Sequence, residues 1–167
     1  MMSSLRAATL ASLALLLSGM SAAVSAQQLD TRFSCSDTRS EMNEKLIYAD
    51  SGEFKLNGDA IQAFRWESSL FRSTHGFDCS IDTEDGLQAE VRDETPRVTW
   101  RVSLKDAAEA RFQRGYDFGR RLNCTIRLER EGDSLSIRPT CPALCGSRPN
   151  FTELSVNLKT GKCRYDE

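Results

Sequence analysis

The 167-residue sequence contains a single histidine, His75. The usual catalytic zinc sites need two or three imidazoles, so one histidine cannot supply them. A Ser-His-Asp system would have to use His75 itself, and Asp78, three residues on, lies in what reads as a connection into a strand. We therefore expect a protein that is not an enzyme, with no catalytic residues, no metal site and no cofactor.

Long apolar runs and basic runs are also missing after residue 26. A bilayer-spanning helix needs about 20 apolar residues, so no membrane insertion is expected beyond that point. The balance of 22 Lys+Arg against 24 Asp+Glu is slightly acidic, and no basic run is interleaved with exposed aromatics. Nucleic acid is therefore not expected as a partner.

The N-terminal 26 residues have the pattern of a secretory signal. A short lead ending in Arg6 precedes an apolar run from Ala7 to Leu17, and Val24-Ser25-Ala26 supplies the small residues of a cleavage site. We predict a cleaved signal peptide at residues 1–26 and a single β-rich domain at residues 27–167. The mature protein would then be periplasmic or secreted.

All six cysteines lie after this segment, and an even number in an exported chain favours three disulfides. If Gly132-Asp133 is a two-residue hairpin loop, opposed residues have numbers that sum to 265, which places Cys124 opposite Cys141. The remaining cysteines then pair as Cys145 with Cys163 and Cys35 with Cys79. The alternative is a tight Cys141–Cys145 bridge, which would leave Cys124 for Cys163.

From Phe54 onward, apolar and polar residues mostly alternate, and turn residues interrupt the alternation. Asn57-Gly58 favours a hairpin with a type I′ turn. Residues 37–49 fit either a helix turn or a strand. The pattern predicts an all-β fold, a single antiparallel β-sandwich or a curved sheet or barrel, stabilised by disulfides, with one short helix at Ala107–Arg114.

Two segments share the pattern W-x-x-S-L, beginning at Trp66 and at Trp100, and each precedes a Cys-Ser/Thr-Ile strand. One interpretation is a three-stranded meander used twice. The other is that unrelated strands and turns share a few common residue types by chance.

Charge is also divided along the chain. Residues 27–91 carry 13 acidic and 6 basic residues, and residues 92–167 carry 11 acidic and 15 basic residues.

Two short motifs resemble catalytic or metal-binding families. Gly132-Asp133-Ser134-Leu135 resembles the nucleophile block of the G-D-S-L hydrolases, but that family needs a histidine near its C-terminal end and none follows Ser134. The segment from Cys141 to Cys145 is similar to the C-P-x-x-C copper site of Sco-type metallochaperones. Only 22 residues follow Cys145, too few for that family's thioredoxin-like domain.

The most unusual remaining segment follows Cys145, where Gly and Pro bracket Ser147 and Arg148. A loop fixed by a disulfide presents side chains at low entropic cost, as protein inhibitors do. The candidate binding residues are Ser147, Arg148 and Asn150. A purely structural loop, with Arg148 paired to a carboxylate, is the alternative.

These observations favour an exported binding or inhibitor-type protein that acts on a protein partner. The acidic N-terminal half favours a basic partner. A role like that of the lysozyme inhibitors fits the small size of the chain and its expected export. The first alternative is a carrier of a small apolar ligand in a β-barrel. The second is a thiol- or copper-handling protein that works through Cys141 and Cys145.

Overall fold

The computed structural model describes residues 27–74, 76–105, 125–139 and 153–165, with the backbone alone at 77–79. Ten strands form two antiparallel sheets, each in sequential strand order. The strands of sheet A are β1 (Gln28–Glu41), β2 (Glu44–Asn57), β3 (Ala60–Phe71) and β4 (Gly76–Asp82). Those of sheet B are β5 (Leu87–Glu94), β6 (Arg97–Leu104), β7 (Thr125–Glu131), β8 (Ser134–Pro139), β9 (Leu154–Asn157) and β10 (Cys163–Tyr165).

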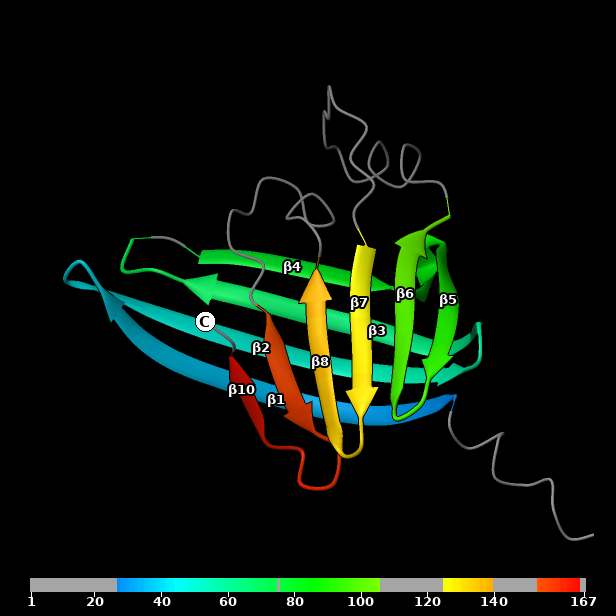
Figure 1. Cartoon of the computed structure of the whole chain (residues 1–167). Helices are drawn as coiled ribbons and strands as arrows, with labels where there is room; N and C mark the ends of the chain where they lie inside the picture. Colours follow the sequence, from blue (N-terminus) through cyan, green and yellow to red (C-terminus); the bar gives the residue numbers. More distant parts are fainter. Residues whose placement is uncertain (1–26, 75, 106–124, 140–152, 166–167) are drawn as a thin grey trace, which may run out of the picture.

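The two sheets pack face to face, and their strands cross steeply (Figure 1). A one-turn 3-10 helix, η1 (Thr83–Asp85), connects β4 to β5 and so leads the chain from sheet A to sheet B. In the described part of the chain, no ladder joins β1 to β10 or β4 to β5. The prediction of an all-β sandwich or curved sheet is confirmed, and the sheets do not close into a barrel.

Alternating residues of both sheets point inward and form one core, as the period of two requires. Sheet A contributes most of the aromatic rings: Phe33 meets Phe54 edge-on, and Phe54 stacks on Phe64 with ring centroids 4.5 Å apart. The Phe33 ring lies over Gly52, where a Cβ atom would clash with it. Both tryptophans, Trp66 in β3 and Trp100 in β6, are fully buried between the sheets.

Two hairpin turns show how glycine sets the register. Glu131 pairs with Ser134, so Gly132-Asp133 is a two-residue loop, and Ile126 lies opposite Pro139 as the sum of 265 predicts. The β2–β3 turn differs from the prediction by one residue. Asn57 pairs with Ala60 and the loop is Gly58-Asp59, because Gly58, with φ of +57°, takes the first central position that a type II′ turn reserves for glycine.

The first hairpin settles the ambiguity of residues 37–49. Met42 and Asn43 both have positive φ, 47° and 67°, and they form a tight turn between two 14-residue strands. The segment is therefore strand on both sides of the turn. The helix predicted at Ala107–Arg114 lies outside the described residues.

Two predicted disulfide pairings, Cys35–Cys79 and Cys145–Cys163, are wrong. Cys35 in β1 is bonded to Cys163 in β10, with Cα atoms 5.8 Å apart. Cys79 lies in β4, at the opposite edge of sheet A, and two strands separate β4 from β1. Strands lie about 4.8 Å apart, so that edge is well beyond the roughly 7 Å Cα separation a disulfide tolerates.

The Cys35–Cys163 bond also excludes the alternative in which Cys163 pairs with Cys124. The predicted Cys124–Cys141 bond lies outside the described residues. The proposed repeat is only half present. Strands β6, β7 and β8 form a meander, but the chain after β4 crosses to sheet B, so β3, β4 and β5 do not share one sheet.

Candidate binding surfaces

The predicted binding loop with Ser147, Arg148 and Asn150 lies outside the described residues, as do Cys124, Cys141 and Cys145. Candidate sites in the described part of the chain must therefore come from the two sheets. Polar and charged groups lie in three places: on the outer faces of the sheets, along their edges, and in one buried polar cluster.

The charge division along the sequence, after residue 91, lies five residues beyond the division into sheets, after residue 86. Residues 27–86, which form sheet A and η1, carry 12 acidic and 6 basic residues, a formal net charge of −6. The described residues of sheet B and its turns carry 7 acidic and 10 basic residues, a net charge of +3. The two layers of the sandwich therefore have opposite charge.

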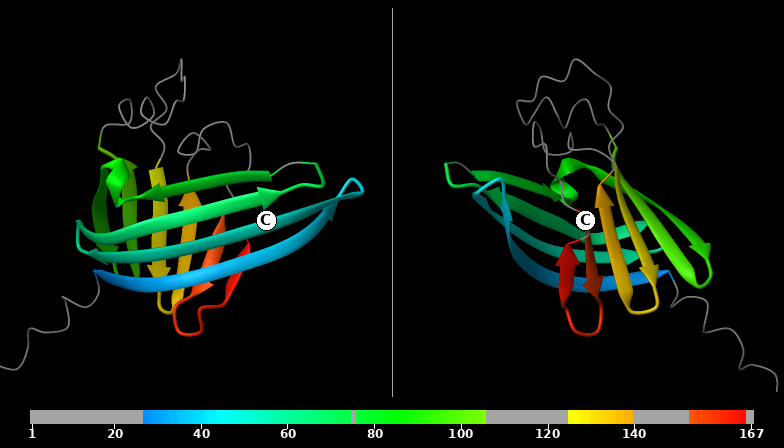
Figure 2. Two further views of the ribbon diagram at one scale, coloured as in Figure 1. Left: turned by 180° about the vertical axis from the view of Figure 1, so that it is seen from behind. Right: turned by 60° about the vertical axis from the view of Figure 1, so that its left-hand side comes forward.

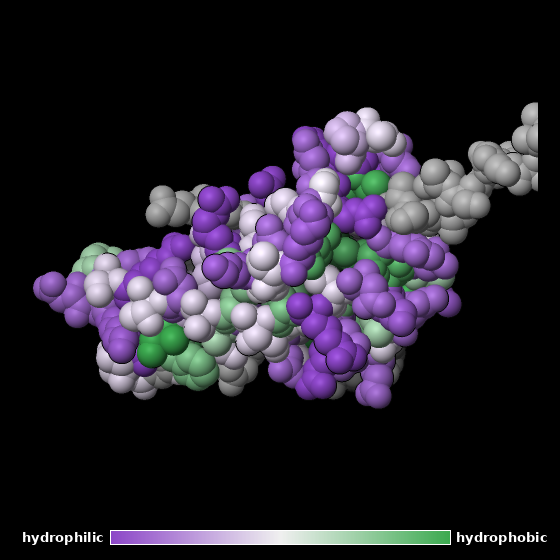
Figure 3. Space-filling view, turned by 90° about the horizontal axis from the view of Figure 1, so that it is seen from below, coloured by the Kyte–Doolittle hydropathy of each residue, from purple (hydrophilic) through white to green (hydrophobic). Residues whose placement is uncertain are grey.

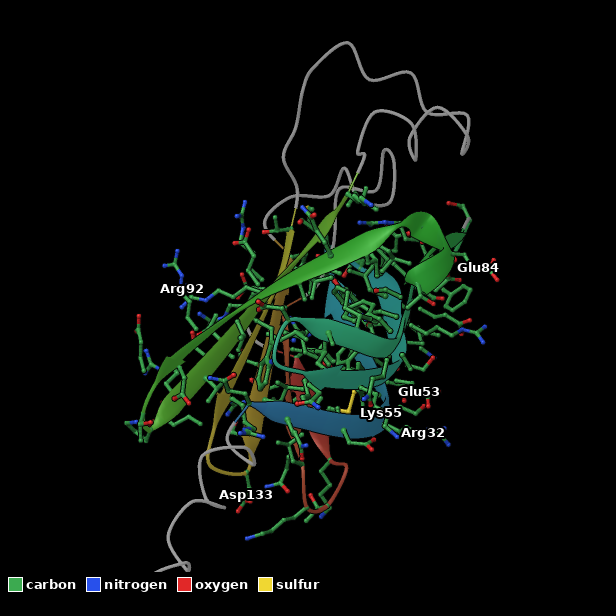
Figure 4. The ribbon with its side chains drawn as sticks, turned by 90° about the vertical axis from the view of Figure 1, so that its right-hand side faces the viewer. Arg32, Glu53, Lys55, Glu84, Arg92 and Asp133 are labelled. Carbon is green, nitrogen blue, oxygen red and sulfur yellow. A yellow bond between two sulfur atoms is a disulfide. The ribbon has the colours of Figure 1, made fainter. Side chains whose placement is uncertain are left out.

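On the outer face of sheet A, cross-strand ion pairs neutralise much of this acidity. Arg32 in β1 lies 2.5 Å from Glu53 in β2, and the hydrogen bond to Glu53 holds the pKa of Arg32 above its usual value. Lys55 pairs with Asp30 at 3.5 Å, and Arg65 bonds to Glu67. Figure 4 shows Arg32, Glu53 and Lys55 gathered on this side of the molecule.

Acidic residues collect where sheet A passes into sheet B. Residues 82–94, which span the end of β4, η1 and β5, contain six acidic residues and one base, Arg92. We call this segment, together with Asp59 of the β2–β3 turn, the acidic edge. Among the described strands, β5 pairs with β6 alone, so it forms one border of sheet B. Glu84 is exposed and projects outward at η1 (Figure 4).

Hydrogen bonds fix the backbone of the acidic edge at both ends. The Glu84 amide donates to Asp82 Oδ1 and the Asp82 amide donates to Asp85 Oδ2, each at 2.8 Å, which is a capping box. Further along, the Val91 amide of β5 donates to Asp59 Oδ1 at 2.6 Å. The acidic edge thus presents its carboxylates from an ordered backbone.

The outer face of sheet B has a different pattern. Arg101, Arg127 and Arg138 lie directly opposite one another on β6, β7 and β8, an arrangement of like charges that normally destabilises a sheet. Each guanidinium has a carboxylate nearby, Glu90 at 3.5 Å, Glu129 at 2.7 Å and Glu153 at 3.5 Å respectively. Acidic and basic groups are interleaved across this face.

Between the sheets, a buried polar cluster lies beside the disulfide. Asp50 in β2 is 3% exposed and accepts hydrogen bonds from Trp66 Nε1 at 3.1 Å and from the Tyr165 hydroxyl at 2.8 Å. Tyr165 follows Cys163 in β10, and Asp50 lies opposite Cys35 in the β1–β2 ladder. The cluster therefore fastens the end of sheet B to sheet A and is enclosed by the core.

Within residues 27–74, 76–105, 125–139 and 153–165, no group of three or more His, Cys, Asp and Glu side chains is arranged to hold a metal ion. No helix among the described residues is long and apolar enough to cross a membrane. No protein-family model, curated protein or solved structure matches the chain.

Sequence reasoning identified the acidic half but not the surface that concentrates it. Glu84-Asp85 and Asp93-Glu94 each read as a solvated turn, and the charge division was placed after residue 91. Six acids in thirteen residues was the available signal. Asp50 gave no such signal, because a carboxylate within an alternating strand reads as a surface residue until its partners are known.

Proposed function

We propose that the mature chain is an exported binding protein of the inhibitor type, whose partner is a basic protein outside the cytoplasm, for example a lysozyme. The observation that carries this proposal is the acidic edge, which lies where the acidic sheet A passes into sheet B and has a hydrogen-bonded backbone. Opposite potentials steer association and raise its rate, and an ordered surface loses little entropy when it binds.

Binding is favoured over catalysis because the acidic edge, residues 82–94 with Asp59, contains carboxylates but no histidine. Carriage of an apolar ligand receives less support. Large side chains, among them Trp66, Trp100, Phe54 and Phe64, fill the space between the sheets and are at most 2% exposed. The Cys35–Cys163 disulfide is compatible with an oxidising compartment.

Affinity capture from periplasmic and culture-medium fractions, followed by mass spectrometry, tests this proposal. The mature protein should retain a basic protein, and the double variant Glu84→Lys/Glu90→Lys should retain much less of it. A matched variant, Glu131→Lys/Glu153→Lys, makes the same charge change on sheet B away from the acidic edge and should behave like the wild type.

A basic protein that binds the acidic-edge variant as well as the wild type would contradict the proposed surface. Recovery of bound lipid, with no protein partner in either fraction, would instead favour the carrier alternative.

A further inference from the structure

Among the described strands, β1 pairs with β2 alone, so its other backbone edge has no partner strand. β10 contacts β1 through side chains: the Cys163 sulfur and the Tyr165 hydroxyl reach Ser34 and Cys35, and the Arg39 guanidinium donates to the Tyr165 carbonyl at 3.5 Å. The hairpin of β1 and β2 projects past sheet B (Figure 2). In the described part of the chain, no backbone hydrogen bond outside the β1–β2 ladder involves residues 36–41.

The turn geometry shows which backbone groups point away from β2. Glu41 and Glu44 flank the two-residue turn and form a hydrogen-bonded pair, and such pairs alternate along an antiparallel ladder. The N–H and C=O groups of Ser36, Thr38 and Ser40 therefore face outward. The Thr38 amide agrees with this assignment, since it donates to Asp37 Oδ1 at 2.8 Å.

This edge is complementary to itself in one antiparallel register. If two copies meet with the two-fold axis at Thr38, Ser36 lies opposite Ser40 and Asp37 lies opposite Arg39. Opposite charges and paired hydroxyl residues in directly opposed positions stabilise a ladder. An axis at Asp37 or at Arg39 would instead oppose two like charges. An axis at Ser40 would pair Arg39 with Glu41, but it would use only residues 39–41 of the strand. Among these registers, the axis at Thr38 gives the longest ladder with opposite charges opposed.

We propose that the mature chain forms a symmetric dimer in which Ser36–Ser40 of β1 pairs antiparallel with the same segment of a second copy. The two A sheets then become one continuous sheet, by strand addition at an exposed edge. In the single chain, Asp37 bonds to the Thr38 amide and to Arg39 Nε at 3.0 Å. In the dimer a carbonyl of the second copy accepts from Thr38, and Asp37 pairs with Arg39 of that copy.

The side chains at this edge fit such a contact. Asp37 is 42% exposed and Arg39 28% exposed, so both charges are partly accessible, although the Arg39 guanidinium also donates to the Tyr165 carbonyl and lies over the Tyr48 ring. Met42, at the tip of the hairpin, is 99% exposed, and the same register places it beside Ser34 of the second copy. Seen from below, the surface is mainly hydrophilic, with hydrophobic residues in small areas (Figure 3). A short, polar ladder predicts a weak dimer that depends on concentration.

Sedimentation velocity of the mature chain, measured from low to high micromolar concentration, tests the proposal. The wild type should change from monomer to dimer over this range. The single variants Asp37→Arg and Arg39→Asp each place like charges opposite one another, and each should weaken the dimer about tenfold or more. A cooperative thermal unfolding transition in each variant serves as the control that it is folded.

Mixing the two single variants distinguishes the dimer contact from the Asp37–Arg39 bond within one chain. In a mixed dimer every charged pair is again opposite in sign, so the mixture should dimerise, whereas mixing cannot restore the bond inside either chain. The double variant Asp37→Arg/Arg39→Asp should also dimerise. Amide exchange at Ser36, Thr38 and Ser40 should slow as wild-type concentration rises.

Three results would overturn the proposal. The wild type could remain monomeric at every concentration. A dimer could form that neither single variant weakens. The mixture could stay monomeric although each variant is folded. This experiment does not involve the acidic edge, so its failure would leave the proposed function standing.

Discussion

Sheet A has strands of up to 14 residues and a net charge of −6, whereas sheet B has strands of three to eight residues and a net charge of +3. Each sheet buries one tryptophan against the other. Trp66 of sheet A donates its indole N–H to Asp50. The Trp100 ring in sheet B lies beneath the Arg130 guanidinium, and its indole N–H has no hydrogen-bond partner among the described residues. The inner faces differ in polarity, because Asp50 of the buried polar cluster lies in sheet A.

The comparison shows that the two layers differ in where their charges and their unpaired edges lie. Acidic residues are concentrated where sheet A passes through η1 into β5, and at the other border of sheet A the outer backbone edge of β1 has no partner strand among the described strands. Sheet B interleaves arginine and glutamate across its outer face. What the two layers share is the core and the Cys35–Cys163 bond, so the predictions below test first the link between the sheets and then their differences.

The largest effect on stability should follow loss of the disulfide that links the two sheets. The double variant Cys35→Ala/Cys163→Ala opens a connection between residues 128 positions apart, and we expect it to lower the free energy of unfolding by about 3–4 kcal/mol. Urea unfolding of the variant and the wild type measures the difference. A change below about 1 kcal/mol would show that the core alone joins the two sheets.

The two tryptophans should respond differently to the same substitution. Trp66→Phe removes the donor to a buried carboxyl and should cost about 2–3 kcal/mol, since hydrogen bonds to charged groups are strong. Trp100→Phe removes an indole N–H that has no partner in the described part of the chain, so the lost volume should account for most of the cost, about 1 kcal/mol. Equal costs in urea unfolding, or a larger cost for Trp100→Phe, would contradict the role given to Asp50.

A smaller, pH-dependent effect is expected at the projecting end of sheet A. Partial desolvation alone would raise the pKa of Glu44, but hydrogen bonds from Ser73 and Arg72 outweigh it and place that pKa below its usual value. The stabilisation is therefore present above the unfolded-state pKa of about 4.3 and is lost as the pH falls through the folded-state value. Glu44→Gln should lower the melting temperature slightly at neutral pH and not at strongly acidic pH. A difference that persists in acid would contradict this assignment.

Much of the fold could be predicted because it depends on local patterns. The period of two gives the strands, and Gly132-Asp133 gives the β7–β8 register residue by residue. The Cys35–Cys163 bond could not be predicted in this way. It joins the first and last described strands, and their proximity depends on how the meander crosses from one sheet to the other, which no short-range pattern encodes.

The candidate surfaces were predicted to different degrees. The acidic character of the N-terminal half is a property of composition and could be counted. Its concentration on the acidic edge depends on η1 and on the bond from Val91 to Asp59, a contact between residues 32 positions apart. The edge of β1 could not be predicted, because residues 37–49 fit either a helix turn or a strand. The positive φ angles of Met42 and Asn43 show that a tight turn lies between two strands.

The most direct test of the central claim is a binding titration of lysozyme, used as a basic protein probe, at low ionic strength. The wild type is compared with Glu84→Lys/Glu90→Lys and with Glu131→Lys/Glu153→Lys, two variants with the same change in net charge, the first on the acidic edge and the second elsewhere on sheet B. If the acidic edge is the recognition surface, the first variant should bind at least about tenfold more weakly and the second within about threefold of the wild type. Equal losses in both variants would show that only net charge matters and would contradict the account.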